Sequence, residues 1–197
     1  MNIIEELKKH PIHSKLAIMI RHGDREKIPA GEHGNEVLLN KKGEENSFAL
    51  GKSLQGYHIN KIFTSPIQRC VQTAEFIASG YGKELEIIQT TCLGAPGLHI
   101  TDDALAGEYF LKYGMFRILD EFRNGEPSPG LRNQSEYSTA MTDFINTNTN
   151  ENGLTIFVTH DSLIALYDYC ISKTIYTQDN WVKYLGGVII NTNYNGK

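Results

Sequence analysis

The sequence predicts an α/β protein that is built on a mostly parallel sheet. Short apolar runs of strand length alternate along the chain with segments in which apolar residues recur at helical spacing. Strands that alternate with helices favour parallel pairing through right-handed crossovers. Three of the apolar runs also end directly in a cluster of polar residues, and ligands of open α/β sheets bind beyond the carboxyl ends of the strands. We therefore expect a functional site at one edge of this sheet.

The individual elements follow from periodicity and from residues that start or stop a helix. Asn40 is suited to cap the helix that follows it, and Pro66 is suited to the first turn of another helix, which Gly80 and Gly82 end. The expected strands are 16–20, 61–64, 85–89, 154–159 and 188–190, and the expected helices are 2–9, 40–54, 66–78, 104–123, 135–145 and 163–169. No repeat or long linker interrupts the chain, so we expect residues 1–197 to form one domain, with an insertion at about 92–153 that shapes the substrate pocket.

Composition narrows the class of protein. The 197 residues carry a net charge of −4 with acids and bases interspersed, and no basic run suggests a nucleic-acid partner. No apolar run approaches the roughly 20 residues of a membrane span, and the acidic start of the chain does not resemble a secretory signal. The three cysteines lack the spacing of metal ligands and fit reduced thiols. We expect a soluble, cytoplasmic protein, and these features leave its oligomeric state open.

The polar clusters that follow the strands hold an unusual set of side chains. The candidates for a functional site are Arg21, His22, Arg25, Arg69, His160 and Asp161. Arginine presents a planar fork of donors and stays charged at any relevant pH. Three arginines without an assigned acid suit a multiply charged anion, and a phosphate monoester dianion suits them best. The sequence therefore predicts a small phosphorylated substrate.

The histidine among these arginines has a direct chemical use. A neutral imidazole can attack phosphorus and form a covalent phosphohistidine, which water then hydrolyses. The arginines around His22 disfavour its imidazolium form, and they would neutralise charge on the phosphoryl oxygens in the transition state. The leaving alkoxide needs a proton, and Asp161 is the nearest credible donor. We expect a phosphatase whose chemistry calls for no metal ion or other cofactor.

Three motifs resemble those of the histidine phosphatase superfamily, the phosphoglycerate mutase-like proteins. The motifs are Arg21-His22-Gly23, Ser65 to Arg69 followed by Gln72-Thr73-Ala74, and Val158-Thr159-His160-Asp161. They occur in the order of the family, each after an expected strand, and span roughly residues 16–166. The resemblance implies a three-layer α/β/α sandwich with His22 as the nucleophile. It also implies a phosphate pocket that is made by Arg21, Arg69 and His160.

The motifs combine features of two branches of this family. Arg25 matches the second arginine of the R-H-G-x-R-x-P motif of the acid-phosphatase branch, although Pro29 stands two positions late. His160-Asp161 also looks like that branch, whose aspartate is the proton donor. Residues 65–74 look more like the phosphoglycerate mutase branch, which usually takes its acid from a glutamate after the third strand, and residues 92–96 contain none. The alternatives to Asp161 as proton donor are Asp102, Asp103 and Glu108.

Other functions stay open at this point. His160-Asp161 is also the dipeptide of metal-dependent HD phosphohydrolases, for which His22, Asp24 and His33 could supply further ligands. In that all-helical fold the pair lies within a helix, whereas here it follows a strand, and the nearby arginines would repel a divalent cation. A phosphomutase would use the same phosphoenzyme, and a non-catalytic phosphate-binding module would keep only the pocket. We expect the insertion and the loop after Arg25 to select the substrate.

Overall fold

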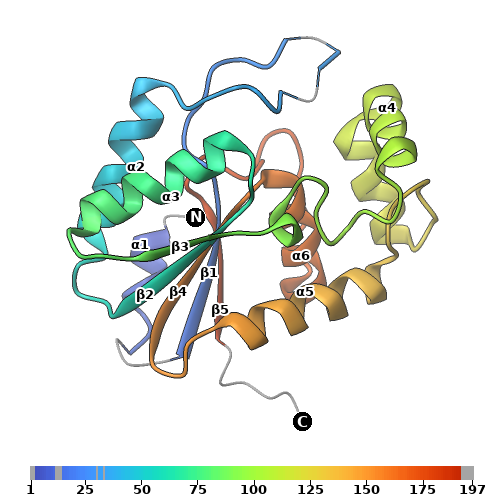
Figure 1. Cartoon of the computed structure of the whole chain (residues 1–197). Coiled ribbons are helices and arrows are strands. Elements are labelled where there is room, and N and C mark those ends of the chain that lie inside the picture. Colours follow the sequence, from blue (N-terminus) through green and yellow to red (C-terminus); the bar gives the residue numbers. More distant parts are fainter. Residues whose placement is uncertain (1–2, 12–14, 30, 33, 192–197) are drawn as a thin grey trace.

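The computed structural model describes residues 3–11, 15–29, 31–32 and 34–191, and it shows an α/β protein (Figure 1). The strands are β1 (Lys15–Arg21), β2 (Ile59–Thr64), β3 (Glu86–Gln89), β4 (Gly153–Thr159) and β5 (Gly187–Asn191). The helices are α1 (Ile3–Leu7), α2 (Lys41–Ser53), α3 (Gln68–Tyr81), α4 (Asp103–Asn124), α5 (Gln134–Asn148) and α6 (Asp161–Ser172). A short 3₁₀ turn, η1 (Thr91–Leu93), follows β3. No helix among the described residues is both long and apolar enough to cross a lipid bilayer.

The five strands form one sheet in the order β3-β2-β4-β1-β5. The first four of these are parallel, and β5 pairs with β1 in the antiparallel direction. Arg21 at the end of β1 pairs with Thr159 at the end of β4, and Thr64 at the end of β2 pairs with Val158. The mostly parallel sheet is therefore confirmed, and the carboxyl ends of β2, β4 and β1 lie side by side.

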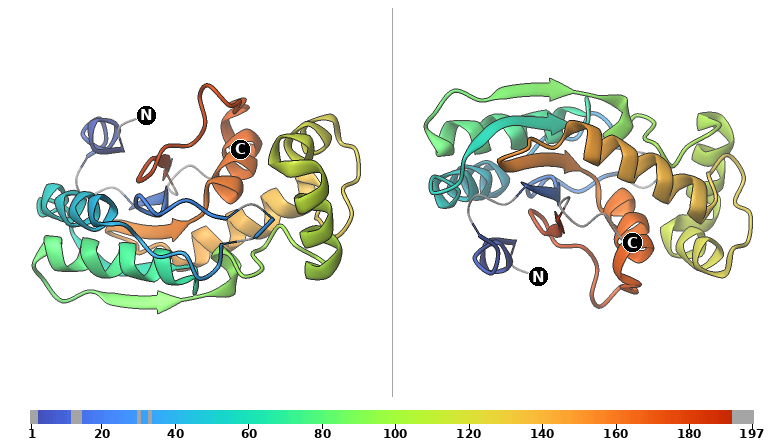
Figure 2. Two further views of the ribbon diagram at one scale, coloured as in Figure 1. Left: turned by 90° about the horizontal axis from the view of Figure 1, so that it is seen from above. Right: turned by 90° about the horizontal axis from the view of Figure 1, so that it is seen from below.

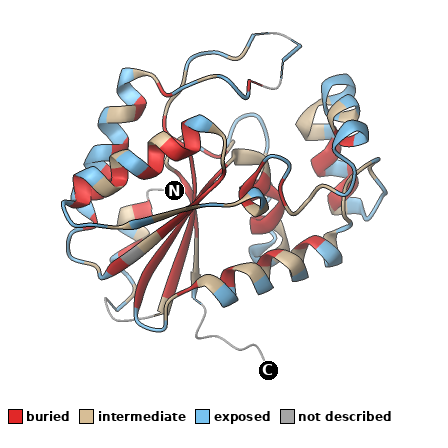
Figure 3. Ribbon diagram, viewed as in Figure 1, coloured by how far each residue is buried: buried red, intermediate tan, exposed pale blue. Residues whose placement is uncertain are grey.

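Helices cover both faces of the sheet, which gives three layers. Alternate residues of β1 enter different cores: Ile18 and Ile20 pack with α1, α2 and α3, whereas Ala17 and Met19 pack with α4, α5 and α6. This alternation is the period of two that a strand imposes on its side chains. Strands β1 and β4 are buried almost throughout, as Figure 3 shows. The expected three-layer sandwich is confirmed, and α4 lies at the end of the molecule away from α2 (Figure 2).

Helices α2 and α3 approach each other closely because glycines face the contact. A Cβ atom on Gly51 would lie 2.1 Å from the carbonyl oxygen of Ile77, and one on Gly80 would lie 2.0 Å from that of Phe48. Only a residue without a side chain fits at these two points. The glycines that weaken the helical pattern of the sequence thus allow α2 and α3 to pack backbone against backbone.

Several helix boundaries differ from the expected ones by two or three residues, and one helix is broken. Pro66 precedes α3, whose N-cap is Ile67 in an extended conformation, so the proline does not occupy the first helical turn. Helix α6 begins at Asp161, two residues earlier than expected, and its N-cap is His160. Helix α4 is broken at Gly114, whose φ of 76° is open to glycine and strained for other residues. The earlier start of α6 matters most, because it keeps His160 and Asp161 at the carboxyl end of β4.

Candidate active site

His22 lies at the carboxyl end of β1 and is almost completely buried, with 2% of its surface exposed. Its Nδ1 lies 2.8 Å from the carbonyl oxygen of Gly23, so Nδ1 carries the proton and donates it. The lone pair is then on Nε2, which accepts a hydrogen bond from Nε of Arg69 at 3.1 Å. Burial lowers the pKa of His22 well below its usual range, and the charges of His160, Arg69 and Arg21 lower it further. The ring is therefore neutral, with its nucleophilic nitrogen facing a guanidinium.

Arg69 connects the ends of three segments. It is the second residue of α3, and its side chain is buried. Besides the bond to His22, Nη1 donates to the carbonyl oxygen of Gly34 at 2.6 Å, and Nη2 lies 3.3 Å from Nδ1 of His160. The hydroxyl of Thr73 donates to the Arg69 carbonyl and accepts from the Gly23 backbone, which holds the first turn of α3 against the end of β1. The guanidinium is thus fixed between the two histidines.

His160 lies at the end of β4, with its ring centroid 5.6 Å from that of His22. Because its Nδ1 faces a donor of Arg69, the proton is on Nε2, which lies 3.1 Å from Oγ of Ser65. Burial lowers the pKa of His160 to about 3, and the charge of Arg69 contributes to this shift. His160 is therefore a neutral donor at the site.

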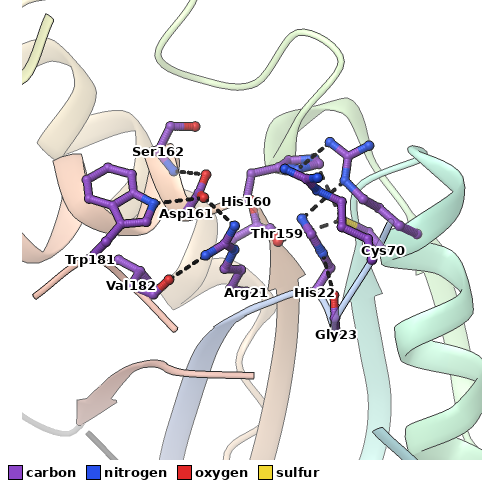
Figure 4. Close-up of polar contacts among 12 residues, drawn as sticks. Arg21, His22, Gly23, Cys70, Thr159, His160, Asp161, Ser162, Trp181 and Val182 are labelled. Atoms are coloured by element: carbon purple, nitrogen blue, oxygen red, sulfur yellow. Dashed lines mark hydrogen bonds and ion pairs between the residues drawn. The ribbon is translucent and has the colours of Figure 1, made fainter. Parts of the chain in front are cut away.

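Arg21, which is buried, and Asp161, which is half-buried, form an ion pair beside the histidines (Figure 4). Nη2 of Arg21 lies 2.7 Å from Oδ2 of Asp161, and Nη1 donates to the carbonyl oxygen of Val182 at 2.6 Å. Asp161 also accepts from the indole Nε1 of Trp181 at 2.9 Å and from the backbone of Ser162 at 2.9 Å. Nε of Arg21 is buried without a hydrogen-bond partner among the described residues. The carboxylate therefore accepts hydrogen bonds at both oxygens, and the guanidinium keeps one donor free.

These side chains surround a cavity of about 550 Å³, a usual size for a small-molecule site. Arg25 lies on its wall; Nη1 donates to the Glu26 carbonyl, and Nε is buried without a partner in the described part of the chain. Arg21 adjoins the cavity through Asp161. The members of the expected site that line the cavity directly are His22, Arg25, Arg69, His160 and Asp161. The structure thus brings the six expected residues together, and their roles remain predictions.

The alternative acids lie elsewhere. Asp102 caps α4 by accepting from the backbone of Leu105, and Glu108 is exposed on that helix. Asp103 lines a neighbouring cavity of about 380 Å³. None of the three lines the cavity that contains His22.

Metal ligands do not gather at this site. Asp24 forms an ion pair with Lys42 at 2.9 Å, and His33 lies outside the described residues. Across the described ranges, no three His, Cys, Asp or Glu side chains are arranged to hold a metal ion. The arrangement around His22 is cationic, and cations of this kind attract an anion rather than a divalent metal.

The sequence did not reveal the segment between α6 and β5 as part of the site. Trp181 and Val182 contact Asp161 and Arg21, and the ring of Tyr184 lies 4.2 Å from the guanidinium carbon of Arg21. The Leu185 backbone donates to the carbonyl of Arg21, which holds this segment over the end of β1. Trp181 is the single tryptophan of the chain, and nothing in its spacing connects it with a site.

The chain is similar to known proteins in sequence and in fold. A model of the histidine phosphatase superfamily (branch 1) matches residues 17–94, which include the first two motifs and end before His160-Asp161. The 2,3-bisphosphoglycerate-dependent phosphoglycerate mutase of Thermoplasma acidophilum is 25% identical over 166 residues, which are 79% of this chain and 76% of that protein.

Two solved structures share the fold. The phosphoglycerate mutase from Bacillus anthracis superposes with a TM-score of 0.57 at 19% identity, covering 89% of this chain and 90% of that one. A mycobacterial glucosyl-3-phosphoglycerate phosphatase superposes with a TM-score of 0.53 at 16% identity, covering 81% and 80%. These findings show that residues 17–94 match the histidine phosphatase superfamily and that the chain has the fold of phosphoglycerate mutase-like proteins.

Proposed function

We propose that the protein is a phosphatase that hydrolyses a phosphate monoester through a phosphohistidine on Nε2 of His22. The observation that carries this proposal is the neutral, buried imidazole whose Nε2 faces Arg69 in a cavity that Arg25 also lines. Nε2 attacks phosphorus, the bond from phosphorus to the ester oxygen breaks, and the leaving alkoxide takes a proton. Water then attacks the phosphohistidine, which releases inorganic phosphate and restores the imidazole.

The proposed phosphate pocket consists of Arg21, Arg25, Arg69 and His160. Arg21 and Arg25 each keep a buried Nε without a partner among the described residues, so a phosphate oxygen can accept from them without breaking a protein hydrogen bond. Arg69 exchanges its bond to His22 for one to the phosphate, which frees the lone pair on Nε2 for attack. The fixed guanidinium groups stabilise charge that develops on the phosphoryl oxygens.

Asp161 is the proposed proton donor for the leaving group. It lines the cavity and at present pairs with Arg21. A phosphate bound at the free Nε of Arg21 would lie beside this carboxyl group, from which a proton can pass to the leaving oxygen. Trp181 keeps the side chain in place through Oδ2.

Replacement of His22 by alanine tests the nucleophile. The variant should release no phosphate from 4-nitrophenyl phosphate at any pH from about 4 to 9, a range that includes the ordinary histidine pKa. The wild-type enzyme should accumulate a phosphate adduct that survives alkaline quenching, and mass spectrometry should locate this adduct on His22. His58→Ala, at an exposed histidine away from the cavity, is the matched control and should keep full activity. Turnover by His22→Ala would refute the proposal, and a wild-type enzyme that binds phosphate without turnover would be a binding module.

A phosphomutase is the second candidate, because the relative from T. acidophilum is named as a phosphoglycerate mutase. Both activities use the same phosphoenzyme and differ in whether water or a second substrate takes the phosphoryl group. Incubation with 3-phosphoglycerate and a trace of 2,3-bisphosphoglycerate distinguishes them. Isomerisation without release of inorganic phosphate would favour the mutase, and release of inorganic phosphate would favour the phosphatase.

A further inference from the structure

The cavity at the candidate active site continues away from His22 into a second space beneath α4. The cavity of about 550 Å³ and the neighbouring one of about 380 Å³ share a wall. We call this shared region the apolar chamber and define it by the residues that line both cavities, Asn35, Ala95, Pro96, His99, Phe110, Met115 and Ser162. These residues belong to 92–153, the expected insertion, except for Asn35 and Ser162. When the phosphate of an ester lies at His22, the organic group attached to it would occupy this chamber.

Charge is distributed unevenly between the two ends. The guanidinium groups on the wall, Arg25 and Arg69, lie at the end that contains His22. Among the described residues, no lysine or arginine lines the second cavity, and its one charged side chain is that of Asp103. An anionic group in the chamber would therefore meet an acid without a compensating cation. The chamber suits an uncharged group and disfavours a carboxylate.

Several side chains of the chamber walls are apolar or aromatic. Phe110 and Met115 line both cavities, and Phe116 and Leu163 line the larger one. Phe116 packs edge to face on Trp181, with ring centroids 5.0 Å apart. Because the indole of Trp181 also donates to Asp161, the apolar wall reaches directly to the proposed proton donor. Burial of an apolar group against such a wall favours binding in proportion to the area removed from water.

His99 is one of three neutral polar residues that line the chamber, together with Asn35 and Ser162. Its Nδ1 is buried and has no hydrogen-bond partner in the described part of the chain. Burial lowers the pKa of His99 to about 4, so the ring is uncharged at neutral pH. Arg132 holds this segment in place, since its backbone donates to the carbonyl of His99 and its side chain donates to that of Leu98, both at 2.8 Å. A buried nitrogen without a partner is costly, and a ligand that provides one removes that cost.

We infer that the substrate is a phosphate monoester of an uncharged, largely apolar alcohol, whose organic group lies against Phe110, Met115 and Phe116 and directs one polar atom to His99. This inference rests on the proposed phosphatase function and names the class of substrate for the same site. According to this inference, residues 92–153 select the substrate by the charge and polarity of its organic group, and they do not bind a second anionic group.

The test compares two phosphate esters of primary alcohols, phenethyl phosphate and 3-phosphoglycerate, because their leaving groups differ little in intrinsic reactivity. We expect kcat/KM, measured by release of inorganic phosphate, to be at least about 10-fold higher for phenethyl phosphate, since a mismatched polar or apolar group in a pocket changes kcat/KM by 10-fold or more. Met115→Lys places a cation in the chamber and should lower this ratio at least about 10-fold, by the electrostatic attraction of the carboxylate.

Leu111→Lys is the matched control, because it makes a similar change on the same helix at an exposed residue that lines neither cavity. It should leave the ratio unchanged. His99→Leu should lower kcat/KM for the ring-hydroxylated analogue of phenethyl phosphate and not for phenethyl phosphate itself. Thermal unfolding of each variant shows that it is folded.

The outcomes separate the inference from the function on which it rests. Absence of phosphate release from every ester, including 4-nitrophenyl phosphate, would overturn the proposed function. Hydrolysis of both primary esters with equal efficiency, or a preference for 3-phosphoglycerate, would overturn the inference and leave the phosphatase intact. A folded Met115→Lys variant with the wild-type ratio would also overturn it.

Discussion

Replacement of Arg69 separates the two effects of its guanidinium at the site. The side chain bonds to Nε2 of His22 at 3.1 Å, to the carbonyl of Gly34 at 2.6 Å and to Nδ1 of His160 at 3.3 Å. Arg69→Lys keeps a positive charge but loses the planar fork that makes these bonds together. Arg69→Met removes both the fork and the charge. The two variants therefore test geometry and electrostatics in turn.

The expected loss of activity follows from the number of donors removed. A fixed donor to charge that develops in a transition state contributes about 3 to 4 kcal/mol, or about 100- to 1,000-fold in rate. Lysine can replace at most a part of the fork, so Arg69→Lys should lower kcat/KM about 100-fold or more. Arg69→Met should lower it at least about 1,000-fold, because no donor or charge remains.

The pH profile distinguishes the two variants. In the proposed mechanism, activity requires neutral His22, so it should fall when the pH drops below the pKa of that ring. The charge of Arg69 is one of the causes that lower this pKa. Its removal in Arg69→Met raises the pKa of His22 towards the usual value, and the acid limb of kcat/KM should move to higher pH. Arg69→Lys keeps the charge and should keep the acid limb of the wild-type enzyme.

The assay measures kcat/KM for one substrate from about pH 4 to 9, a range that includes the usual histidine pKa of about 6.5. The same substrate contributes the same ionisation to every profile, so differences between the variants belong to the protein. Identical acid limbs in Arg69→Met and the wild-type enzyme would refute the electrostatic argument. Full activity of Arg69→Lys would refute the role of the fork.

Three further changes have predictable outcomes. Asp161→Asn should lower kcat/KM about 100-fold for alkyl phosphates, and much less for 4-nitrophenyl phosphate, whose leaving group departs without a proton; equal losses for both would exclude Asp161 as the donor. The pKa of His160 is about 3 in the folded protein and near 6.5 in the unfolded chain, so the unfolded chain binds more protons as the pH falls from 6.5 towards 3. In urea unfolding, the free energy of unfolding should fall by about 2 to 3 kcal/mol between pH 7.5 and 4.5 because of this residue. In His160→Gln this fall should be correspondingly smaller. Gly80→Ala, whose Cβ would lie 2.0 Å from the carbonyl oxygen of Phe48, should destabilise the fold by about 1 to 3 kcal/mol. Gly56→Ala meets no atom within 4 Å and should change stability by less than about 0.5 kcal/mol; a similar loss in both would contradict the packing argument.

Local patterns in the sequence predicted most of the elements correctly. Asn40 caps α2 as expected, with its side chain accepting from the backbone of Gly43, and β1 and β4 lie within two residues of their expected bounds. Such features depend on neighbouring residues, so periodicity and capping patterns reveal them. The boundary at Pro66 was less well predicted, because whether a proline enters the first turn or precedes it depends on how the strand before it ends.

The sequence by itself determined which residues are delivered to the site. Each candidate follows an apolar strand, and the carboxyl ends of parallel strands meet at one edge, so Arg21, His22, Arg69 and His160 could be grouped without coordinates.

Only the tertiary structure decided how these residues contact one another and what surrounds them. The pairing of Arg21 with Asp161, the approach of Trp181 and the burial of His99 each join segments far apart in the chain. No local pattern encodes such contacts, because they arise when the helices pack on the sheet and close a cavity. The charge and polarity of that cavity, and with them the proposed class of substrate, come from packing rather than from sequence spacing.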